Sequence, residues 1–222
     1  MELSPRLALA ARLCTPCRSV IDVGCDHAYL CIHLVEQGAI YAFAADIRPG
    51  PLASARANIA ACGLSDRIRP VLCPGLEGFS PDDADTISIC GMGGELIASI
   101  LDAAPWTADG RHRLVLQPMT CAHRLRKWLH GHGFSVRREA LAQEGRRLYV
   151  VLEAVGGAED TCGAENGYYF TSALLSDPLF PVFARGLRRQ QERARAGKRL
   201  AGRATAAEDA ILKRLEELGY GA

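Results

Sequence analysis

The sequence predicts an α/β fold: a mostly parallel, seven-stranded sheet with helices on both faces, followed by a helical C-terminal domain. Three observations predict it. Strand-like and helix-like runs alternate from residue 3 to about residue 155, the pattern of a parallel sheet covered on both faces. Beyond residue 167, apolar residues recur at three- and four-residue steps, the period of a helix. A chain of 222 residues is also long enough for one sizeable core and a smaller appendage.

The elements follow in order along the chain. Arg6 and Arg12 interrupt a short apolar stripe at the start, so we expect an amphipathic helix there and not a signal peptide. The strand-like runs are residues 19–23, 42–45, 67–72, 86–90, 113–116, 135–142 and 148–154. The helical patterns are residues 29–37, 51–62, 95–103 and 122–132. The last two strands are joined directly across QEGRR, which predicts an antiparallel hairpin.

Five parallel strands that end in such a hairpin are typical of the Rossmann-like fold of class I methyltransferases, whereas a plain dinucleotide-binding fold usually continues in parallel. We expect this domain to span residues 1–155. Residues 156–167, GGAEDTCGAENG, are small and polar and predict a linker. In residues 168–222, helical patterns at 179–200 and 204–218 predict an antiparallel hairpin. Its apolar positions are Leu187, Ala207, Ile211, Leu215 and Leu218.

The overall composition excludes several classes of protein. The formal net charge is +1, so any charged partner must be recognised by a local patch. No apolar run approaches the ~20 residues of a membrane helix, and we expect a cytoplasmic protein. Nine cysteines, an odd number, indicate reduced thiols. The CTPC motif at residues 14–17 lacks a second Cys or His pair, so we expect no metal site.

The stretch VIDVGCDHAYL, residues 20–30, predicts a cofactor-binding turn between a strand and a helix. The dinucleotide fingerprint G-x-G-x-x-G is incomplete, because Asp26 replaces its second glycine after Gly24. A carboxylate would repel a pyrophosphate but can pair with the ammonium and sulfonium of S-adenosylmethionine. The turn therefore favours S-adenosylmethionine over NAD. His27 has two interpretations: a contact with the methionine carboxylate or with Asp26, or a cap of the following helix.

Two later strand ends extend this site. Asp46 lies about twenty residues after the glycine turn, where an acidic group can bind a ribose diol; the alternative is a solvated carboxylate. GMGG, residues 91–94, places three glycines in four residues, where the backbone must approach something closely. The alternative is a tight turn before the next helix.

Longer motifs occur in a fixed order from residue 3 to about residue 152: LSPRL, DVGCDHAYL, ADIRPGPLASARANI, DTISICGMGGELIASIL, LVLQP, LRKWL and GFSVRREAL. In these motifs the chain resembles the bacterial tRNA (adenine-22, N1)-methyltransferase family over about two-thirds of its length. The resemblance implies transfer of a methyl group from S-adenosylmethionine to N1 of adenine 22 in tRNA. It also implies that the helical C-terminal domain is coiled-coil-like and helps to hold the tRNA.

The resemblance implies a cofactor site made by the three loops above and the CPGL loop. Its residues are Gly24, Asp26 and His27 at the methionine part, Asp46 and Ile47 at the ribose and adenine, Gly75 and Leu76 in CPGL, and Gly91, Met92 and Gly93 beside the transferred methyl. Pro74 departs from the acidic or amide residue usual in the family, so the usual side-chain hydrogen bond to the cofactor adenine is either missing or supplied by the backbone. Gln117, at the end of the fifth strand, is expected to position the target base.

The chemistry of adenine N1 constrains the mechanism. N1 carries a lone pair and no proton, so we expect no general base, and the enzyme has mainly to align donor and acceptor. The adenine must be unpaired or flipped out of its helix. Tyr29 and Met92 are candidates for the apolar walls of the pocket that receives it, with core packing as the alternative for Tyr29.

A basic run in the C-terminal domain is the predicted tRNA contact. Residues 185–203, RGLRRQQERARAGKRLAGR, hold eight Arg and Lys residues against one Glu, a pattern that can follow phosphates. The candidate contacts are Arg185, Arg188, Arg189, Arg193, Arg195, Lys198 and Arg199. A solvated helix face is the alternative.

Two other functions stay open on the sequence, as does the oligomeric state. A class I methyltransferase with another acceptor would show no tRNA-dependent methyl transfer, and a non-catalytic RNA-binding protein on the same scaffold would not bind the cofactor. Cys90 also has two interpretations. It either faces the cleft, where a cationic cofactor would lower its pKa, or is a buried strand cysteine.

Overall fold

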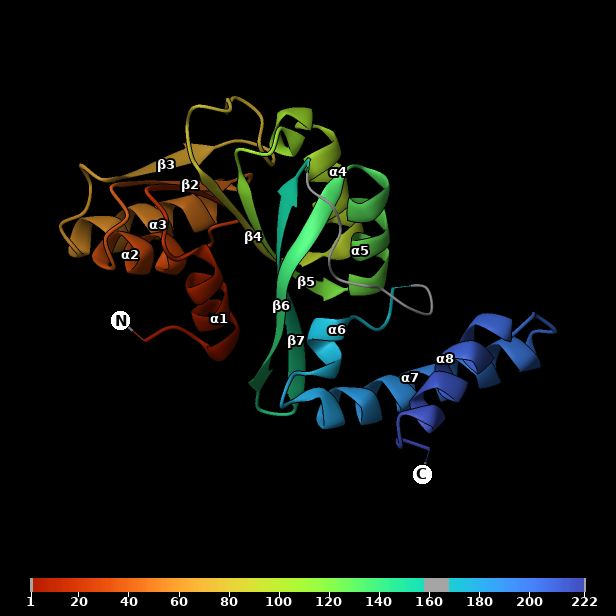
Figure 1. Ribbon diagram of the computed structural model, residues 1–222. Helices are drawn as coiled ribbons and strands as arrows, with labels where there is room; N and C mark the ends of the chain where they lie inside the picture. Colours follow the sequence, from red (N-terminus) through yellow and green to blue (C-terminus); the bar gives the residue numbers. More distant parts are fainter. Residues whose placement is uncertain (1, 158–167, 222) are drawn as a thin grey trace. The chain divides into compact units, whose positions relative to one another are not determined.

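The structure is a computed structural model that describes residues 2–157 and 168–221. The chain divides into two compact units, Met1–Cys162 and Gly163–Ala222. In the described part of the first unit, seven strands form one sheet in the order β3-β2-β1-β4-β5-β7-β6 (Figure 1). The strands are β1 (Ser19–Val23), β2 (Tyr41–Asp46), β3 (Ile68–Leu72), β4 (Thr86–Gly93), β5 (Arg113–Thr120), β6 (Phe134–Glu144) and β7 (Arg147–Gly156).

Strands β1 to β5 pair in parallel, and β7 is antiparallel to both of its neighbours, β5 and β6. The predicted mostly parallel sheet that ends in an antiparallel hairpin is therefore confirmed. The hairpin turn is only two residues long, because Glu144 already pairs with Arg147.

Helices cover both faces of the sheet (Figure 1). One face carries α1 (Pro5–Cys14), α2 (Tyr29–Glu36) and α3 (Pro49–Ala61), and the other carries α4 (Gly94–Asp102), the 3-10 helix η1 (Pro105–Ala108) and α5 (Ala122–Gly131). Successive residues of a strand point to opposite faces. Accordingly Val20 belongs to the core cluster under α1 to α3, and Ile21 belongs to the cluster under α4 and α5.

Five strands extend further than predicted: β2, β4, β5, β6 and β7. The first three residues of the GMGG segment belong to β4 and not to a loop, because Met92 and Gly93 still pair with β5. The pairing register is irregular between Cys90 and Gly93. The hairpin strands are also longer, and β7 takes Gly156, the first residue of the predicted linker. A Cβ on Gly156 would lie 2.3 Å from the carbonyl oxygen of Ala108, so only glycine fits there. The rest of that linker, from residue 158, lies outside the described residues.

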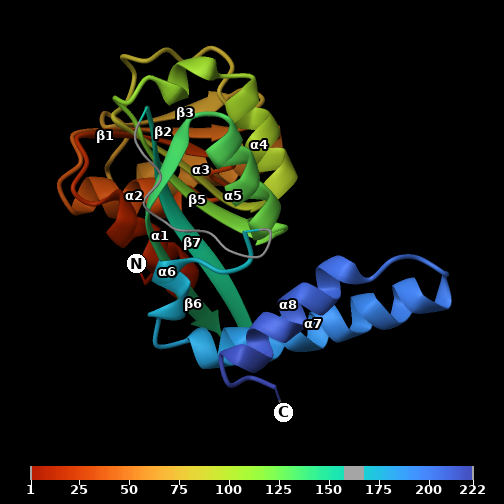
Figure 2. The same cartoon turned by 45° about the vertical axis from the view of Figure 1, so that its right-hand side comes forward.

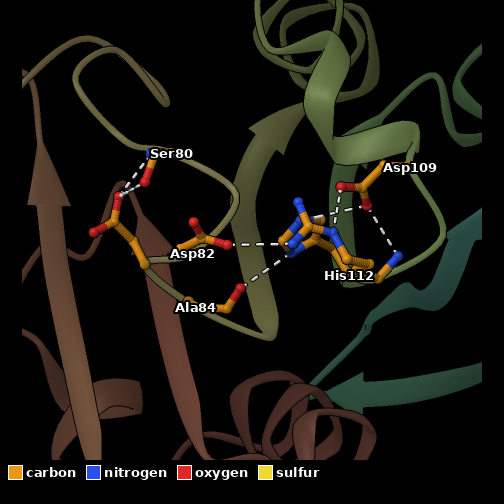
Figure 3. Close-up of polar contacts among 7 residues, drawn as sticks. Ser80, Asp82, Ala84, Asp109 and His112 are labelled. Atoms are coloured by element: carbon orange, nitrogen blue, oxygen red, sulfur yellow. Dashed lines mark hydrogen bonds and ion pairs between the residues drawn. The ribbon is translucent and has the colours of Figure 1, made fainter.

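The segment between β3 and β4 is held at its far end by polar contacts (Figure 3). The Arg111 guanidinium pairs with Asp82 at 3.2 Å and with Asp109 at 2.8 Å. Nδ1 of buried His112 lies 3.0 Å from the carbonyl oxygen of Ala84. These contacts fasten a segment whose other end, at residues 73–77, contributes to the candidate site.

The second unit contains α6 (Ser172–Leu175), α7 (Phe180–Leu200) and α8 (Ala206–Glu217). Helices α7 and α8 lie side by side (Figure 1 and Figure 2). They run antiparallel, because Arg188 near the start of α7 pairs with Glu216 near the end of α8, and Lys198 near the end of α7 pairs with Glu208. The predicted hairpin is confirmed. Ala207, predicted to be an apolar contact, is instead exposed.

Within the described ranges, no helix combines the length and the apolar character needed to cross a membrane.

Candidate functional site

A cavity of about 880 Å³ opens at the carboxyl ends of the parallel strands. Its walls come from the start of α1, the β1–α2 turn, the ends of β2 and β4, the 73–77 segment and α4. Ligands of open α/β sheets bind at this edge, and the volume lies in the ~300–1,000 Å³ range of small-molecule sites. A second cavity, between the starts of β1 and β2 and residues 81–85, has a volume of only about 400 Å³.

The β1–α2 turn has an unusual backbone. Gly24, Asp26 and Ala28 all have positive φ angles, of 75°, 48° and 59°. For Asp26 and Ala28 this conformation is strained and is held by surrounding contacts, a feature that clusters at functional sites. A Cβ on Gly24 would lie only 2.3 Å from the terminal methyl of Met92, so the bare glycine lets the end of β4 approach the turn.

The side chains of Asp26 and His27 both line the cavity. Nε2 of His27 lies 3.7 Å from Oδ2 of Asp26, and its ring stacks on Tyr29 with centroids 5.2 Å apart. The N-terminal cap residue of α2 is Ala28, and no side chain caps this helix. The structure thus contradicts a capping role for His27 and agrees with the alternative in which it orients Asp26.

The opposite wall is formed by the end of β2 and the 73–77 segment. Asp46 is buried, and its Oδ1 accepts a hydrogen bond of 2.8 Å from the backbone N–H of Arg48. Ile47 lines the same wall although its side chain is 65% exposed. Gly75 has a φ of 60°, and both it and Leu76 face the cavity together with Pro74, whose ring offers no hydrogen bond.

The glycine-rich end of β4 contributes only part of what was expected. Cys90, Gly91 and Met92 line the cavity. Gly93 does not; a Cβ there would lie 3.3 Å from the Thr120 hydroxyl, on the side of β5. The requirement for glycine at position 93 is thus one of packing.

Gln117 lies behind the cavity wall and is fully buried. Its Oε1 accepts hydrogen bonds of 3.1 Å from Nη1 of Arg6 and 3.1 Å from the backbone N–H of Gly91. Gln117 does not line the cavity, so its side chain is not placed to contact a target base there, contrary to the expectation. It follows Val115 on the face of the sheet that α1 covers, and it holds the end of β4 and Arg6 in place.

Several cavity residues were not predicted from the sequence, among them Arg6 and Asp22. Arg6, noted only as an interruption of an apolar stripe, lines the cavity, and its motif LSPRL was the signal that could have found it. Asp22, at the end of β1, is buried and also lines the cavity. Burial raises the pKa of Asp22 to about 7, although hydrogen bonds from Ser88 and Cys31 favour its charged form.

Cys90 lines the cavity, but its thiol is not activated. Burial, and then the nearby Asp22 carboxylate, raise its pKa to about 12; the lowered pKa expected beside a cationic cofactor concerns the ligand-bound protein. Thiolate is the reactive form, so this cysteine is chemically quiet in the absence of ligand.

The basic run of α7 separates into two groups. Arg188, Arg195, Lys198 and Arg199 pair with acidic residues of the hairpin, at distances from 2.6 to 3.8 Å. Arg185, Arg189 and Arg193 are exposed and make no ion pair with any described residue. Their four-residue spacing places these three on one face of the helix. We call them the α7 arginine stripe.

Comparisons with known proteins agree with this geometry. A family model described as "Methyltransferase domain" matches residues 3–152. The curated tRNA (adenine(22)-N(1))-methyltransferase of Bacillus subtilis (strain 168) is 35% identical over 180 residues, which cover 81% of this chain and 75% of the relative. The crystal structure of Streptococcus pneumoniae Sp1610 superimposes with a TM-score of 0.86 at 32% identity, covering 98% of this chain and 99% of the other. A second structure of Sp1610, in complex with S-adenosyl-L-methionine, has a TM-score of 0.83 at 31% identity, with the same coverage.

Proposed function

Because the chain belongs to the tRNA (adenine(22)-N(1))-methyltransferase family, we propose that it transfers a methyl group from S-adenosylmethionine to N1 of adenine 22 in tRNA. The observation that carries the proposal is the cavity at the carboxyl edge of the sheet, in a chain related over 81% of its length to a curated enzyme of this activity. A tRNA acceptor also fits the expected cytoplasmic location, which stays a prediction.

The residues of the cavity fit S-adenosylmethionine. Because Gly24 and Gly75 have no Cβ, the side chains of Met92 and Ile100 pack directly against these two turns and shape the cavity wall; a Cβ would lie 2.3 Å from Met92 or 3.1 Å from Ile100. Asp46 holds the ribose hydroxyls, while Ile47, Gly75 and Leu76 contact the adenine. At the other end Gly24, Asp26 and His27 bind the methionine part, and Gly91 and Met92 frame the methyl group. Gly93 does not line the cavity and supports the end of β4 by packing against β5.

Carboxylates distinguish this cofactor from a dinucleotide. Asp22 and Asp26 both line the cavity, where they favour a ligand with positive charge and disfavour a pyrophosphate. When bound, S-adenosylmethionine supplies a methyl group made electrophilic by the sulfonium.

The protein's part in the reaction is to position the acceptor and exclude water. The N1 lone pair forms the new N–CH₃ bond while the S–CH₃ bond breaks and its electron pair stays on sulfur, so no side chain has to remove a proton before attack. Tyr29 and Met92 provide apolar walls for the unpaired adenine. Gln117 keeps the end of β4 in place through the N–H of Gly91. Alignment of this kind can lower a barrier by roughly 7–11 kcal/mol.

The tRNA is held by residues 168–222, which follow the catalytic domain and its linker; Gly156 belongs to that domain as the last residue of β7. The α7 arginine stripe binds phosphates. The paired residues Arg188, Arg195, Lys198 and Arg199 keep α7 and α8 together and contribute less to binding.

The test is to incubate the protein with S-adenosylmethionine and unmodified tRNA and to identify modified nucleosides by mass spectrometry. N1-methyladenosine is the expected product. Cofactor binding without methylation of tRNA would favour another acceptor, and the lack of cofactor binding would favour a non-catalytic RNA-binding protein.

A further inference from the structure

We propose that Arg6 forms an anion-binding site at the β5 end of the cavity, and that its ligand is the carboxylate of the methionine part of the cofactor. The inference rests on the proposed function, because it takes S-adenosylmethionine as the cofactor. It adds a residue from α1 to a site so far built from strand ends and loops.

The cavity has two chemically different ends. Asp46, at the ribose end, terminates β2, whereas Arg6 is bonded to Gln117 on β5. In the sheet, β1 and β4 lie between these strands, so the two ends are separated by three strand spacings, about 14 Å. A nucleoside joined to an amino acid has its diol and its carboxylate at opposite ends. A cavity with an acid at one end and a cation at the other matches that order.

The guanidinium of Arg6 is held in place before any ligand binds. Its Nη1 donates to Oε1 of Gln117 at 3.1 Å, and its Nε lies 3.6 Å from Oε1 of Glu144. Its central carbon lies 5.8 Å from the centre of the Tyr149 ring. A fixed guanidinium loses little conformational entropy when it forms a further bond.

The same guanidinium still has donors to offer. Its Nη2 makes no hydrogen bond to any residue in the described part of the chain, and the side chain is 27% exposed where it lines the cavity. A Cβ on Gly91 would lie 3.6 Å from Nη1, so the end of β4 passes within van der Waals distance of the guanidinium. The guanidinium therefore lies beside the glycine-rich end of β4 with one nitrogen still available to a ligand.

A carboxylate is the ligand that fits best. The amino-acid part of the cofactor carries one ammonium and one carboxylate. Asp22 and Asp26 suit the ammonium, and a planar guanidinium suits the carboxylate. His27, the sequence-based candidate for this role, lies 3.7 Å from Asp26, whose charge opposes a second carboxylate there. A phosphate of the target nucleotide shares the same chemistry and is distinguished by the experiment.

The experiment measures binding by calorimetry, without any methyl transfer. Wild-type protein, Arg6→Gln and Arg6→Lys are each titrated with S-adenosylmethionine and with decarboxylated S-adenosylmethionine, which lacks only the carboxylate. Arg6→Gln is expected to weaken S-adenosylmethionine about tenfold to a hundredfold, the loss of one charge-assisted bond. The decarboxylated ligand should bind wild type and variant equally, and Arg6→Lys should recover part of the loss.

Arg48→Gln is the matched control. Arg48 also lines the cavity, but at the ribose end, where its Nε lies 3.7 Å from Asp46. Both ligands carry the ribose, so this variant should change both affinities by the same factor. Unchanged melting temperatures would show that the variants fold.

Two results would overturn the proposal. If Arg6→Gln weakened both ligands equally, Arg6 would only shape the cavity. If it left S-adenosylmethionine binding unchanged, the proposal would be wrong; weaker binding of unmodified tRNA by Arg6→Gln in a parallel titration would then assign the anion to a phosphate of the RNA. A wild-type protein that binds neither ligand would refute the proposed function itself, which keeps the two failures apart.

Discussion

The α7 arginine stripe allows a quantitative test of how the second unit holds RNA. Replacing Arg185, Arg189 and Arg193 with Gln removes three exposed charges that make no ion pair within the described residues, so the hairpin should keep its fold. If each contacts one phosphate, the slope of log K against log salt should become shallower by about 2–3 units. At 0.1 M salt this corresponds to a loss of affinity of roughly a hundredfold or more.

The assay is tRNA binding by fluorescence anisotropy at several salt concentrations. The control replaces Arg188, Arg195 and Lys198 with Gln, which removes the same formal charge from residues already paired inside the hairpin. This control should lower the melting temperature and change the salt slope less. Equal slopes for wild type and the stripe variant would refute the proposed role of these arginines.

Three further predictions concern the first unit. Gly24→Ala should lose about 1–2 kcal/mol of stability, because the backbone there has a positive φ, and should also lose cofactor affinity. The control is Gly63→Ala, which also has a positive φ, of 67°, but has open space around it, so it should lose stability only. The raised pKa of Asp22, about 7, means that the folded ligand-free protein binds the Asp22 proton more tightly than the unfolded chain does. The protonated Asp22 therefore stabilises the fold at low pH, and this stabilisation is lost as the pH rises from about 4 to 7. Asp22→Asn should remove this pH dependence from denaturation curves. Arg126→Ala should lower the free energy of unfolding in urea by about 3–5 kcal/mol. The change removes the guanidinium nitrogen that lies 2.6 Å from Oε1 of Glu139 and leaves this buried carboxylate without that partner.

Each of these has a clear contrary result. Equal cofactor affinity in Gly24→Ala and Gly63→Ala would mean that contact with Met92 is unimportant. A pH dependence of stability that persists in Asp22→Asn would assign it to other groups. A loss below about 1 kcal/mol in Arg126→Ala would mean that water or a rearranged side chain satisfies Glu139.

The fold was largely predictable because its signals are local. Apolar runs and helical periods fall within single elements, and the direct connection at QEGRR identified the antiparallel hairpin. The extension of β4 was not predictable in this way. Glycines usually end a strand, and here the backbone N–H of Gly91 bonds to the side chain of Gln117, 26 residues away.

The site was predictable where chain order and strand direction define it. Gly24, Asp46 and Gly91 meet because the carboxyl ends of parallel strands lie at one edge. The position of Arg6 could not be inferred, because it depends on the packing of α1 against β5 and β6. The sequence of α7 likewise suggested more unpaired positive charge than the structure has. Part of the basic run pairs with Glu208, Asp209 and Glu216 of α8.

The central claim is that this chain methylates one adenine of tRNA at N1. Its most direct test is methyl transfer from labelled S-adenosylmethionine to two unmodified transcripts that differ only in whether adenine or guanine stands at position 22. The account predicts about one N1-methyladenosine per molecule of the first transcript and no incorporation into the second. Equal incorporation into both transcripts, or none into either despite cofactor binding, would contradict it.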